Sequence, residues 1–194
     1  MKTEELIEII HNYKSKHGAN FYEDFLCLEI CRFLREHKEN AFNRNNPNGH
    51  LTAGGIIVCG DWVLMNHHKI LNKWIGFGGH FENDETNPFI TASREVKEES
   101  GINGLRSNGV ILDIDKFTFK HDKMPAHIHY DIRYLFVAPN KYVSKSNESC
   151  ELVWLPLEHA IGYSTDNAVK KILGKYKRLL DSKKKNTPIE DIVK

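Results

Sequence analysis

The sequence predicts an α/β fold of the α+β type, with helices before and after a set of strands. In the first 40 residues, apolar side chains recur three to four positions apart, as on one face of a helix. From Leu51 onward they form short runs separated by turn residues, which is typical of strands. Helical spacing returns between Val169 and Leu180. These three observations indicate one mixed domain with helices at both ends.

Two helices are expected to open the chain. The first contains an apolar stripe over residues 6–13, and the second contains one over residues 26–37. Asn20 followed by Glu23 is a capping box for the second helix. The polar stretch 40–48 then reads as a linker or surface loop. We therefore predict that residues 1–49 form a helical extension, residues 50–182 the main domain and residues 183–194 a solvated tail.

Strands are expected from residue 51. Residues 56–59 and 62–65 are apolar runs around Gly60-Asp61, which predicts a tight hairpin. Further runs at residues 110–114, 117–119, 128–137 and 152–155 predict more strands. A glycine-rich stretch, 76–79, leads from the hairpin into an acidic segment.

The acidic segment predicts a helix over residues 88–99. Asn87 suits the N-cap, Pro88 the first helical position and Gly101 the position past the end. At 100° per residue, Glu95, Glu98 and Glu99 share one arc of that helix. Three adjacent carboxylates repel one another, and a hard divalent cation such as Mg²⁺ or Mn²⁺ would offset the repulsion.

This segment resembles the signature of the Nudix hydrolase (MutT-like) family. The pattern is Gly, five residues, Glu, seven residues, Arg-Glu, an aliphatic residue, one residue, Glu-Glu, one residue, Gly and an aliphatic residue. Residues 79–102 match every fixed position with one extra residue between Glu85 and Arg94, so the place of Glu85 relative to the helix is not fixed by the pattern. The resemblance extends over about residues 50–180. Three further segments contribute to it: His50-Leu-Thr-Ala, Trp74 ahead of Gly78-Gly79-His80, and Glu148 before Trp154.

The resemblance implies an α/β/α sandwich with a mixed sheet and a hydrolase of nucleoside diphosphates linked to another group. Implied metal ligands are Glu95, Glu98, Glu99 and the Gly78 carbonyl, with Arg94 orienting the glutamates. Gly79 would allow close approach of the backbone to metal or phosphate. The general base stays open between Glu95 or Glu98 and the later pair Glu148 or Glu151.

A strict alternation over residues 127–134 places four polar side chains on one strand face: His127, His129, Asp131 and Arg133. That face is either solvated or lines the substrate cleft, in which case His129 and Arg133 would bind substrate. A zinc site from His127 and His129 is less favoured, because no third ligand stands at a recognisable spacing.

Composition excludes several partner classes. The net charge is only +1 in 194 residues, so broad attraction to nucleic acid or membrane is not expected. Met1 leads straight into charged residues and no apolar run is long enough for a span. The four cysteines form no CxxC pair and are expected to be reduced, as in a cytoplasmic protein. A homodimer is left open.

Two other functions stay open besides hydrolysis. A diphosphate isomerase could use a related fold. A sensing module could bind such a nucleotide without cleaving it, although sensors of this kind often lose the box glutamates, which are all present here.

Overall fold

Two long parallel strands form the centre of the sheet in the computed structural model, which describes residues 1–17, 21–68, 72–82, 84–121, 124–143, 149–164 and 166–184. Strand β1 (His50–Cys59) pairs in parallel with β6 (Met124–Val137), and His50 lies directly opposite His129. The other pairings are antiparallel, so the sheet is mixed, as predicted.

Five further strands extend this centre. Strand β5 (Ile111–His121) pairs with β6 at one edge. The opposite side of β1 is shared, because β2 (Trp62–His68) pairs with its C-terminal end and β4 (Phe77–His80) with its N-terminal half. Strands β3 (Lys73–Ile75) and β7 (Ser149–Pro156) both pair with β2.

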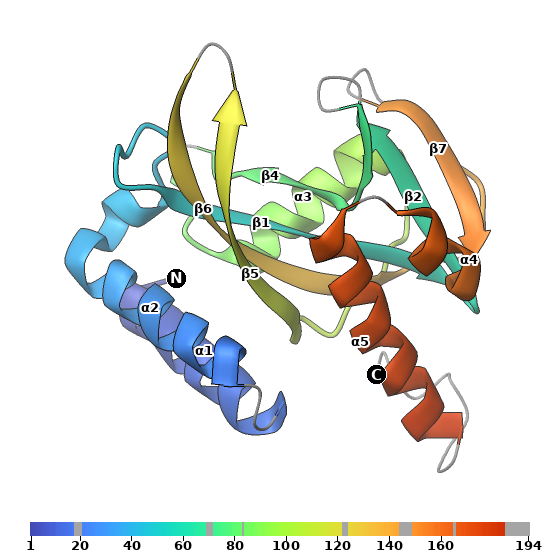
Figure 1. Cartoon of the computed structure of the whole chain (residues 1–194), viewed down its shortest axis with the longest axis horizontal. Coiled ribbons are helices and arrows are strands. Elements are labelled where there is room, and N and C mark those ends of the chain that lie inside the picture. Colours follow the sequence, from blue (N-terminus) through green and yellow to red (C-terminus); the bar gives the residue numbers. More distant parts are fainter. Residues whose placement is uncertain are drawn as a thin grey trace.

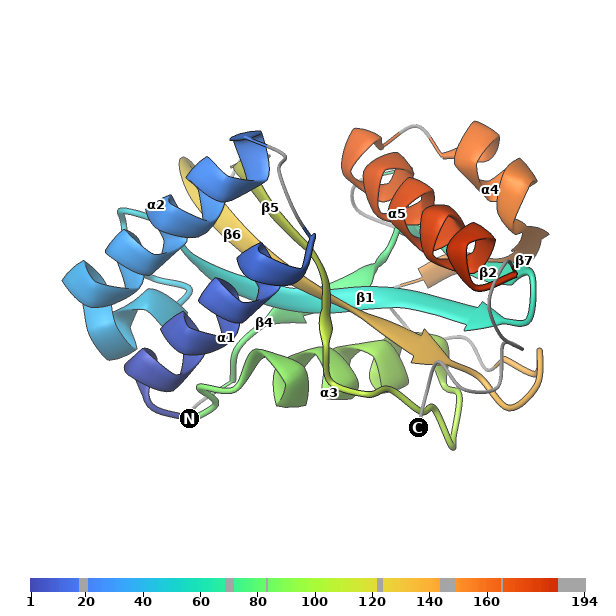
Figure 2. The ribbon, with the colours of Figure 1, turned by 90° about the horizontal axis from the view of Figure 1, so that it is seen from below.

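Helices cover both sides of the sheet, which confirms the predicted sandwich with its N-terminal helices (Figure 2). Helices α1 (Thr3–His17) and α2 (Phe21–His37), the 3₁₀ helix η1 (Lys38–Phe42) and α3 (Pro88–Ser100) share one core with β1 and β6. Helices α4 (Leu157–Tyr163) and α5 (Asn167–Lys184) pack with β1 and β2 in a second core. Figure 1 shows α1 and α2 at one end of the molecule and α5 towards the other.

Local signals explain most of these elements. The Gly60-Asp61 hairpin is confirmed, since Cys59 pairs with Trp62 and Gly60 has a φ of 58°. The runs predicted as two strands between residues 110 and 119 form the single strand β5, which contains a register shift after Ile111. Strands β3 and β4 and helix α4 were not predicted. The Asn20 end of the proposed capping box and residues 185–194 lie outside the described residues.

The part of the chain described here contains no helix long and apolar enough to cross a membrane. The Cys27 and Cys31 thiols are free and buried, in line with the prediction of reduced cysteines.

Candidate active site

Helix α3 presents the predicted glutamates and is fixed at both ends by its own sequence. The Asn87 side chain accepts a hydrogen bond from the Phe89 amide, and Gly101 ends the helix in the left-handed conformation with a φ of 65°. Ala92 and Val96 are fully buried against the sheet. The apolar face of α3 is thereby held on β1 and β4, and Glu95 and Glu99 lie against the glycine-rich strand.

Arg94 organises the carboxylates around the start of this acidic face. Its guanidinium donates to Glu85 at 2.9 and 3.1 Å, to Glu95 at 2.9 Å and to Glu98 at 3.3 Å. It also donates to the His80 carbonyl oxygen at 2.9 Å. The hydrogen bond from Arg94 lowers the pKa of Glu85 to about 2. Arg94 therefore links β4, α3 and the loop between them.

The extra residue in the signature leaves Glu85 in contact with the helix. Glu85 also accepts hydrogen bonds from the Thr91 hydroxyl at 2.9 Å and from the Glu82 amide at 3.0 Å. The insertion is therefore accommodated in the loop before α3.

Glu99 points from the helix into the glycine-rich strand. It is 4% exposed, and its Oε2 accepts a hydrogen bond from the Gly78 amide at 3.0 Å. Gly78 has a φ of 151°, and a Cβ there would lie 2.7 Å from the Gly54 Cα. Only glycine allows β4 to approach β1 this closely.

Gly79 meets the helix on its other side. A Cβ at position 79 would lie 2.4 Å from Glu95 Oε1, so any side chain would push that carboxylate away. Gly78 and Gly79 thus form a backbone surface against which Glu99 and Glu95 lie.

The donor set fits a hard divalent cation. Carboxylate and carbonyl oxygens are the ligands that Mg²⁺ and Mn²⁺ prefer. Glu98 is 59% exposed and faces solvent beside the more buried Glu95. Arg94 hydrogen-bonds Glu95 and Glu98, whereas Glu99 accepts from the Gly78 amide. Among the described side chains, the carboxylate oxygens of Glu95, Glu98 and Glu99 do not all lie within 4.8 Å of one another.

The two alternative bases lie on and before β7. Glu148 lies outside the described residues. Glu151 is exposed on β7, where it pairs in register with His67 of β2. The choice of base therefore stays a prediction.

The histidines predicted on the polar face of β6 lie beside two further histidines, His50 of β1 and His80 of β4, which the sequence did not connect with them. His129 is buried, and its ring lies 4.5 Å from the His50 ring and 5.3 Å from the His80 ring, measured between centroids. Burial is the main reason that the pKa falls to about 3 for His50 and His129 and to about 4 for His80. These three rings are neutral at pH 7.

Arg133, on the same face, is surrounded by carboxylates of the protein itself. Its guanidinium lies 2.6 Å from Asp131, 3.9 Å from Asp115 and 4.0 Å from Asp113, and the side chain is 14% exposed. Lys171 of α5 bridges Asp113 and Asp115 at 3.2 Å each. The face near Arg133 is therefore an ion network under α5 rather than a simply solvated strand.

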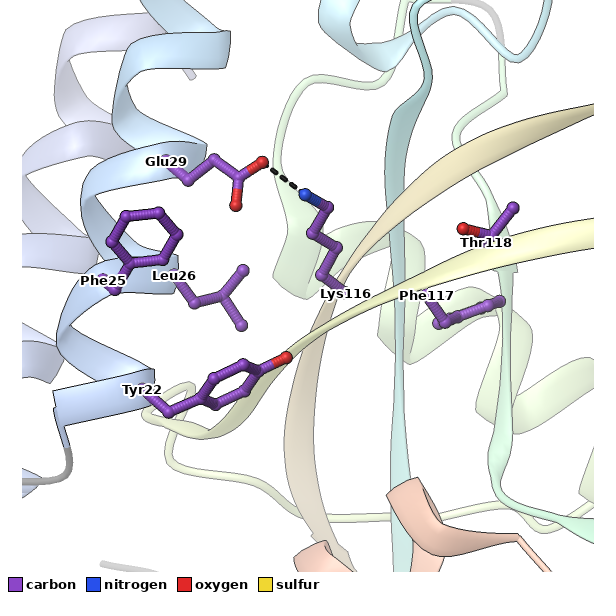
Figure 3. Close-up of a pocket in the computed structure, with 7 residues that line it drawn as sticks. All are labelled: Tyr22, Phe25, Leu26, Glu29, Lys116, Phe117 and Thr118. Carbon is purple, nitrogen blue, oxygen red and sulfur yellow. Dashed lines mark hydrogen bonds and ion pairs between the residues drawn. The ribbon is translucent and has the colours of Figure 1, made fainter.

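A separate pocket of about 310 Å³ lies between α2 and β5 (Figure 3). Its lining includes Tyr22, Phe25 and Phe117, and Lys116 reaches across it to Glu29. None of the predicted site residues lines this pocket.

Comparison with known proteins places the whole sheet region in one family. The family model of the NUDIX domain matches residues 49–177. No curated protein matches the sequence.

Several solved structures share the fold. A C. elegans Ap4A hydrolase complex is 21% identical, with a TM-score of 0.57 over 68% of this chain and 98% of its own. The NUDIX domain of Shewanella oneidensis NrtR, complexed with ADP ribose, is 12% identical, with a TM-score of 0.55 over 75% of this chain and 97% of its own. The E. coli dihydroneopterin triphosphate pyrophosphohydrolase is 18% identical, with a TM-score of 0.53 over 65% and 93%. With a family-model match over about two thirds of its length and an intact glutamate helix, the chain belongs to the Nudix family.

Proposed function

We propose that this protein uses Mg²⁺ or Mn²⁺ to hydrolyse the diphosphate linkage of a nucleoside diphosphate joined to another group. The observation that carries the proposal is the packing of Glu95 and Glu99 against the Gly78-Gly79 backbone. This packing brings two carboxylates of α3 against the backbone of the glycine-rich strand, and carboxylate and carbonyl oxygens are ligands that a hard divalent ion prefers. It supports Glu95, Glu98, Glu99 and the Gly78 carbonyl as the metal ligands.

The protein side chains have distinct roles in this proposal. Arg94 fixes the directions of Glu95 and Glu98 through its two hydrogen bonds. A bound divalent ion would polarise the phosphate and offset charge on the leaving group. A glutamate accepts the proton of the attacking water as the new phosphorus–oxygen bond forms and the bridging bond breaks. Glu95, Glu98, Glu148 and Glu151 are the candidates for that base.

Substrate recognition is proposed for the polar face of β6 and for the glycine strand. Gly79 would bring the backbone close to a phosphate, and His129 and Arg133 would line the cleft. Arg133 would have to share its guanidinium with the substrate and with Asp131, which it contacts at 2.6 Å. A cytoplasmic location and the absence of nucleic-acid and membrane partners belong to the same proposal, and a homodimer stays open.

A substrate panel with and without chelator tests the function. The panel should contain Ap4A, ADP-ribose, dihydroneopterin triphosphate, nucleoside triphosphates, NADH, nucleotide sugars and CoA, and released phosphate or nucleotide is measured. We expect turnover of at least one compound, its loss in EDTA and its return with Mg²⁺ or Mn²⁺. Full turnover in excess chelator would contradict the metal-dependent mechanism, and tight binding of a nucleotide without cleavage would favour the sensing module.

A further inference from the structure

Four imidazoles from three neighbouring strands converge on the sheet face opposite α3. His50 comes from β1, His80 from β4, and His127 and His129 from β6. Of the His, Cys, Asp and Glu side chains that the structure describes, His50, His80 and His129 are the set whose ligand atoms all lie within 4.8 Å of one another. The Nε2 atoms of His127 and His129 are 2.9 Å apart.

Sheet register, rather than sequence spacing, produces this cluster. His50 and His129 are direct partners in the parallel β1–β6 pair. His80 is opposite Thr52 in the β1–β4 pair, on the side of β1 away from β6. His127 precedes His129 by two residues and so lies on the same face of the strand. Three backbone strands therefore hold the rings in fixed positions.

His50 is a buried polar group that lacks a partner within this cluster. Its side chain is 1% exposed, and neither ring nitrogen has a hydrogen-bond partner among the described residues. A neutral imidazole has one donor and one acceptor nitrogen, and buried polar groups are satisfied in the great majority of cases. The His50 ring lies 4.5 Å from the His129 ring and 5.0 Å from each of the His80 and His127 rings, measured between centroids.

We propose that His50, His80 and His129 bind a zinc ion, with His127 as the fourth ligand. Imidazole nitrogen is a preferred zinc ligand, with bond lengths of about 2.0–2.1 Å and tetrahedral geometry. That geometry places ligand nitrogens about 3.3 Å apart, so small side-chain movements convert the present cluster into a site.

The surroundings fit an ion of this kind. The Nδ1 of His127 lies 2.8 Å from the Pro125 carbonyl oxygen, which leaves its Nε2 directed at His129. Contacts of this type fix the tautomer of metal-bound histidines. The ring of Phe119 stacks on His129 at 5.0 Å and covers the cluster with apolar surface. Arg44 opposes a cation here, but it is exposed and its charge is screened by solvent.

The zinc would have a positioning effect on the catalytic strand. His80 follows Gly79 directly, and its carbonyl oxygen accepts a hydrogen bond from Arg94. A zinc-bound His80 would therefore fix the end of β4 against which Glu95 and Glu99 lie. The zinc site itself does not depend on the proposed hydrolysis.

Metal retention by the full chain tests the proposal. The purified protein is stripped with chelator, loaded with Zn²⁺ in the presence of excess Mg²⁺ and passed through gel filtration, and its bound zinc is measured by mass spectrometry. Excess Mg²⁺ occupies the oxygen ligands of α3 but competes poorly for imidazoles. We expect about one zinc ion per chain in the wild type.

Substitutions then assign the ligands. His50→Gln and His129→Gln are each expected to reduce zinc affinity by at least about tenfold, since even the loss of an outer-shell partner has an effect of that size. His159→Gln, which changes an exposed histidine of α4, is the matched control, and Glu99→Gln should also keep its zinc. A wild type that retains no zinc, or histidine variants that retain as much as the control, would overturn the proposal.

Cobalt provides a readout that does not depend on the folding of any variant. Co²⁺ bound to the wild type should show the intense visible absorption of a tetrahedral nitrogen site. The weak absorption of octahedral, oxygen-bound Co²⁺ would instead overturn the proposed histidine site.

Discussion

The carboxylate of Glu99 joins the acidic helix to the glycine strand. It is almost completely buried, and it accepts a hydrogen bond from the Gly78 amide. A buried carboxylate is unfavourable unless it is hydrogen-bonded or close to a cation. The proposed role of Glu99 as a metal ligand would place a cation beside this buried carboxylate.

Glu99→Gln should leave the fold intact and lower kcat by orders of magnitude. The amide oxygen can still accept from the Gly78 amide, but a neutral amide is a poor ligand for a hard cation. Steady-state kinetics on the best substrate and a melting curve measure the two effects. Glu36→Gln, which changes an exposed side chain of α2, is the control. An active Glu99→Gln enzyme would show that the metal lies elsewhere.

Gly79→Ala should reduce activity because its methyl group would enter the space occupied by the Glu95 carboxylate, 2.4 Å away. Displacement of a site group by about 1 Å can lower the rate by roughly 100-fold. Gly162→Ala is the matched control, because a Cβ at that position in α4 meets nothing within 4 Å. Equal activities for the two variants would argue against a catalytic position for Glu95.

The loop before α3 and the helix itself are held together by the Arg94–Glu85 pair. The pKa of Glu85 is lowered from 4.5 to about 2, chiefly because Arg94 hydrogen-bonds its ionised form. A lowered carboxyl pKa means that the pair stabilises the fold fully above about pH 4.5 and loses this effect as the pH falls towards 2.

Glu85→Gln should therefore destabilise the protein at neutral pH but progressively less in acid. Urea unfolding of wild type and variant between pH 7 and 3 measures the difference, which should be constant above about pH 4.5 and shrink below it. A difference that is the same at every pH would mean that the carboxylate charge of Glu85 contributes nothing.

Strand β6 carries Arg133 within its ion network, and this residue has both a structural and a proposed substrate role. Arg133→Ala would leave the largely buried carboxylate of Asp131 without the guanidinium that it contacts at 2.6 Å, and loss of one partner of a buried pair costs about 3–5 kcal/mol. We expect a fall in the free energy of unfolding of about that size.

Steady-state kinetics tests the proposed substrate-binding role of Arg133 separately from its structural role. If its guanidinium also holds a phosphate, KM should rise by about tenfold or more in Arg133→Ala. Lys171→Met disturbs the same ion network from α5 and should leave KM unchanged. Unchanged kinetics in both variants would remove Arg133 from substrate binding.

At the scale of the whole molecule, the N-terminal helices belong to the central core. Leu34 of α2 is fully buried in the same cluster as Leu51, Val96 and Ile132, and the Phe33 ring lies 4.6 Å from the Tyr130 ring. Lys175 of α5 also contacts Glu23 at 2.7 Å and Asp113 at 2.6 Å. The extension is therefore expected to unfold together with the sheet.

Leu34→Ala should destabilise the entire protein by about 2–5 kcal/mol, in one cooperative transition. Leu28→Ala is the matched control, because Leu28 lies on the same helix but is 54% exposed; its effect should be under about 0.5 kcal/mol. Calorimetry that resolves two transitions, with only the first one shifted in Leu34→Ala, would show that α1 and α2 form an independent unit.

Local sequence determined the acidic helix and the family of this protein. Asn87, Pro88 and Gly101 act on the helix that contains them, and the spacing of Glu95, Glu98 and Glu99 sets their common face without help from distant residues. The same holds for the β1–β2 hairpin at Gly60-Asp61. These features could be predicted because short-range geometry decides them.

Only the tertiary structure decided which distant residues meet. Strand β4 has no alternating pattern, and it exists as a strand because Gly78 and Gly79 can lie against β1 and α3. The carboxylates around Arg133 and the partners of His129 come from other strands and helices. The sequence alone did not show that His50 and His80 lie beside His129. The register of three strands brings these histidines together, and that register depends on the packing of the whole sheet.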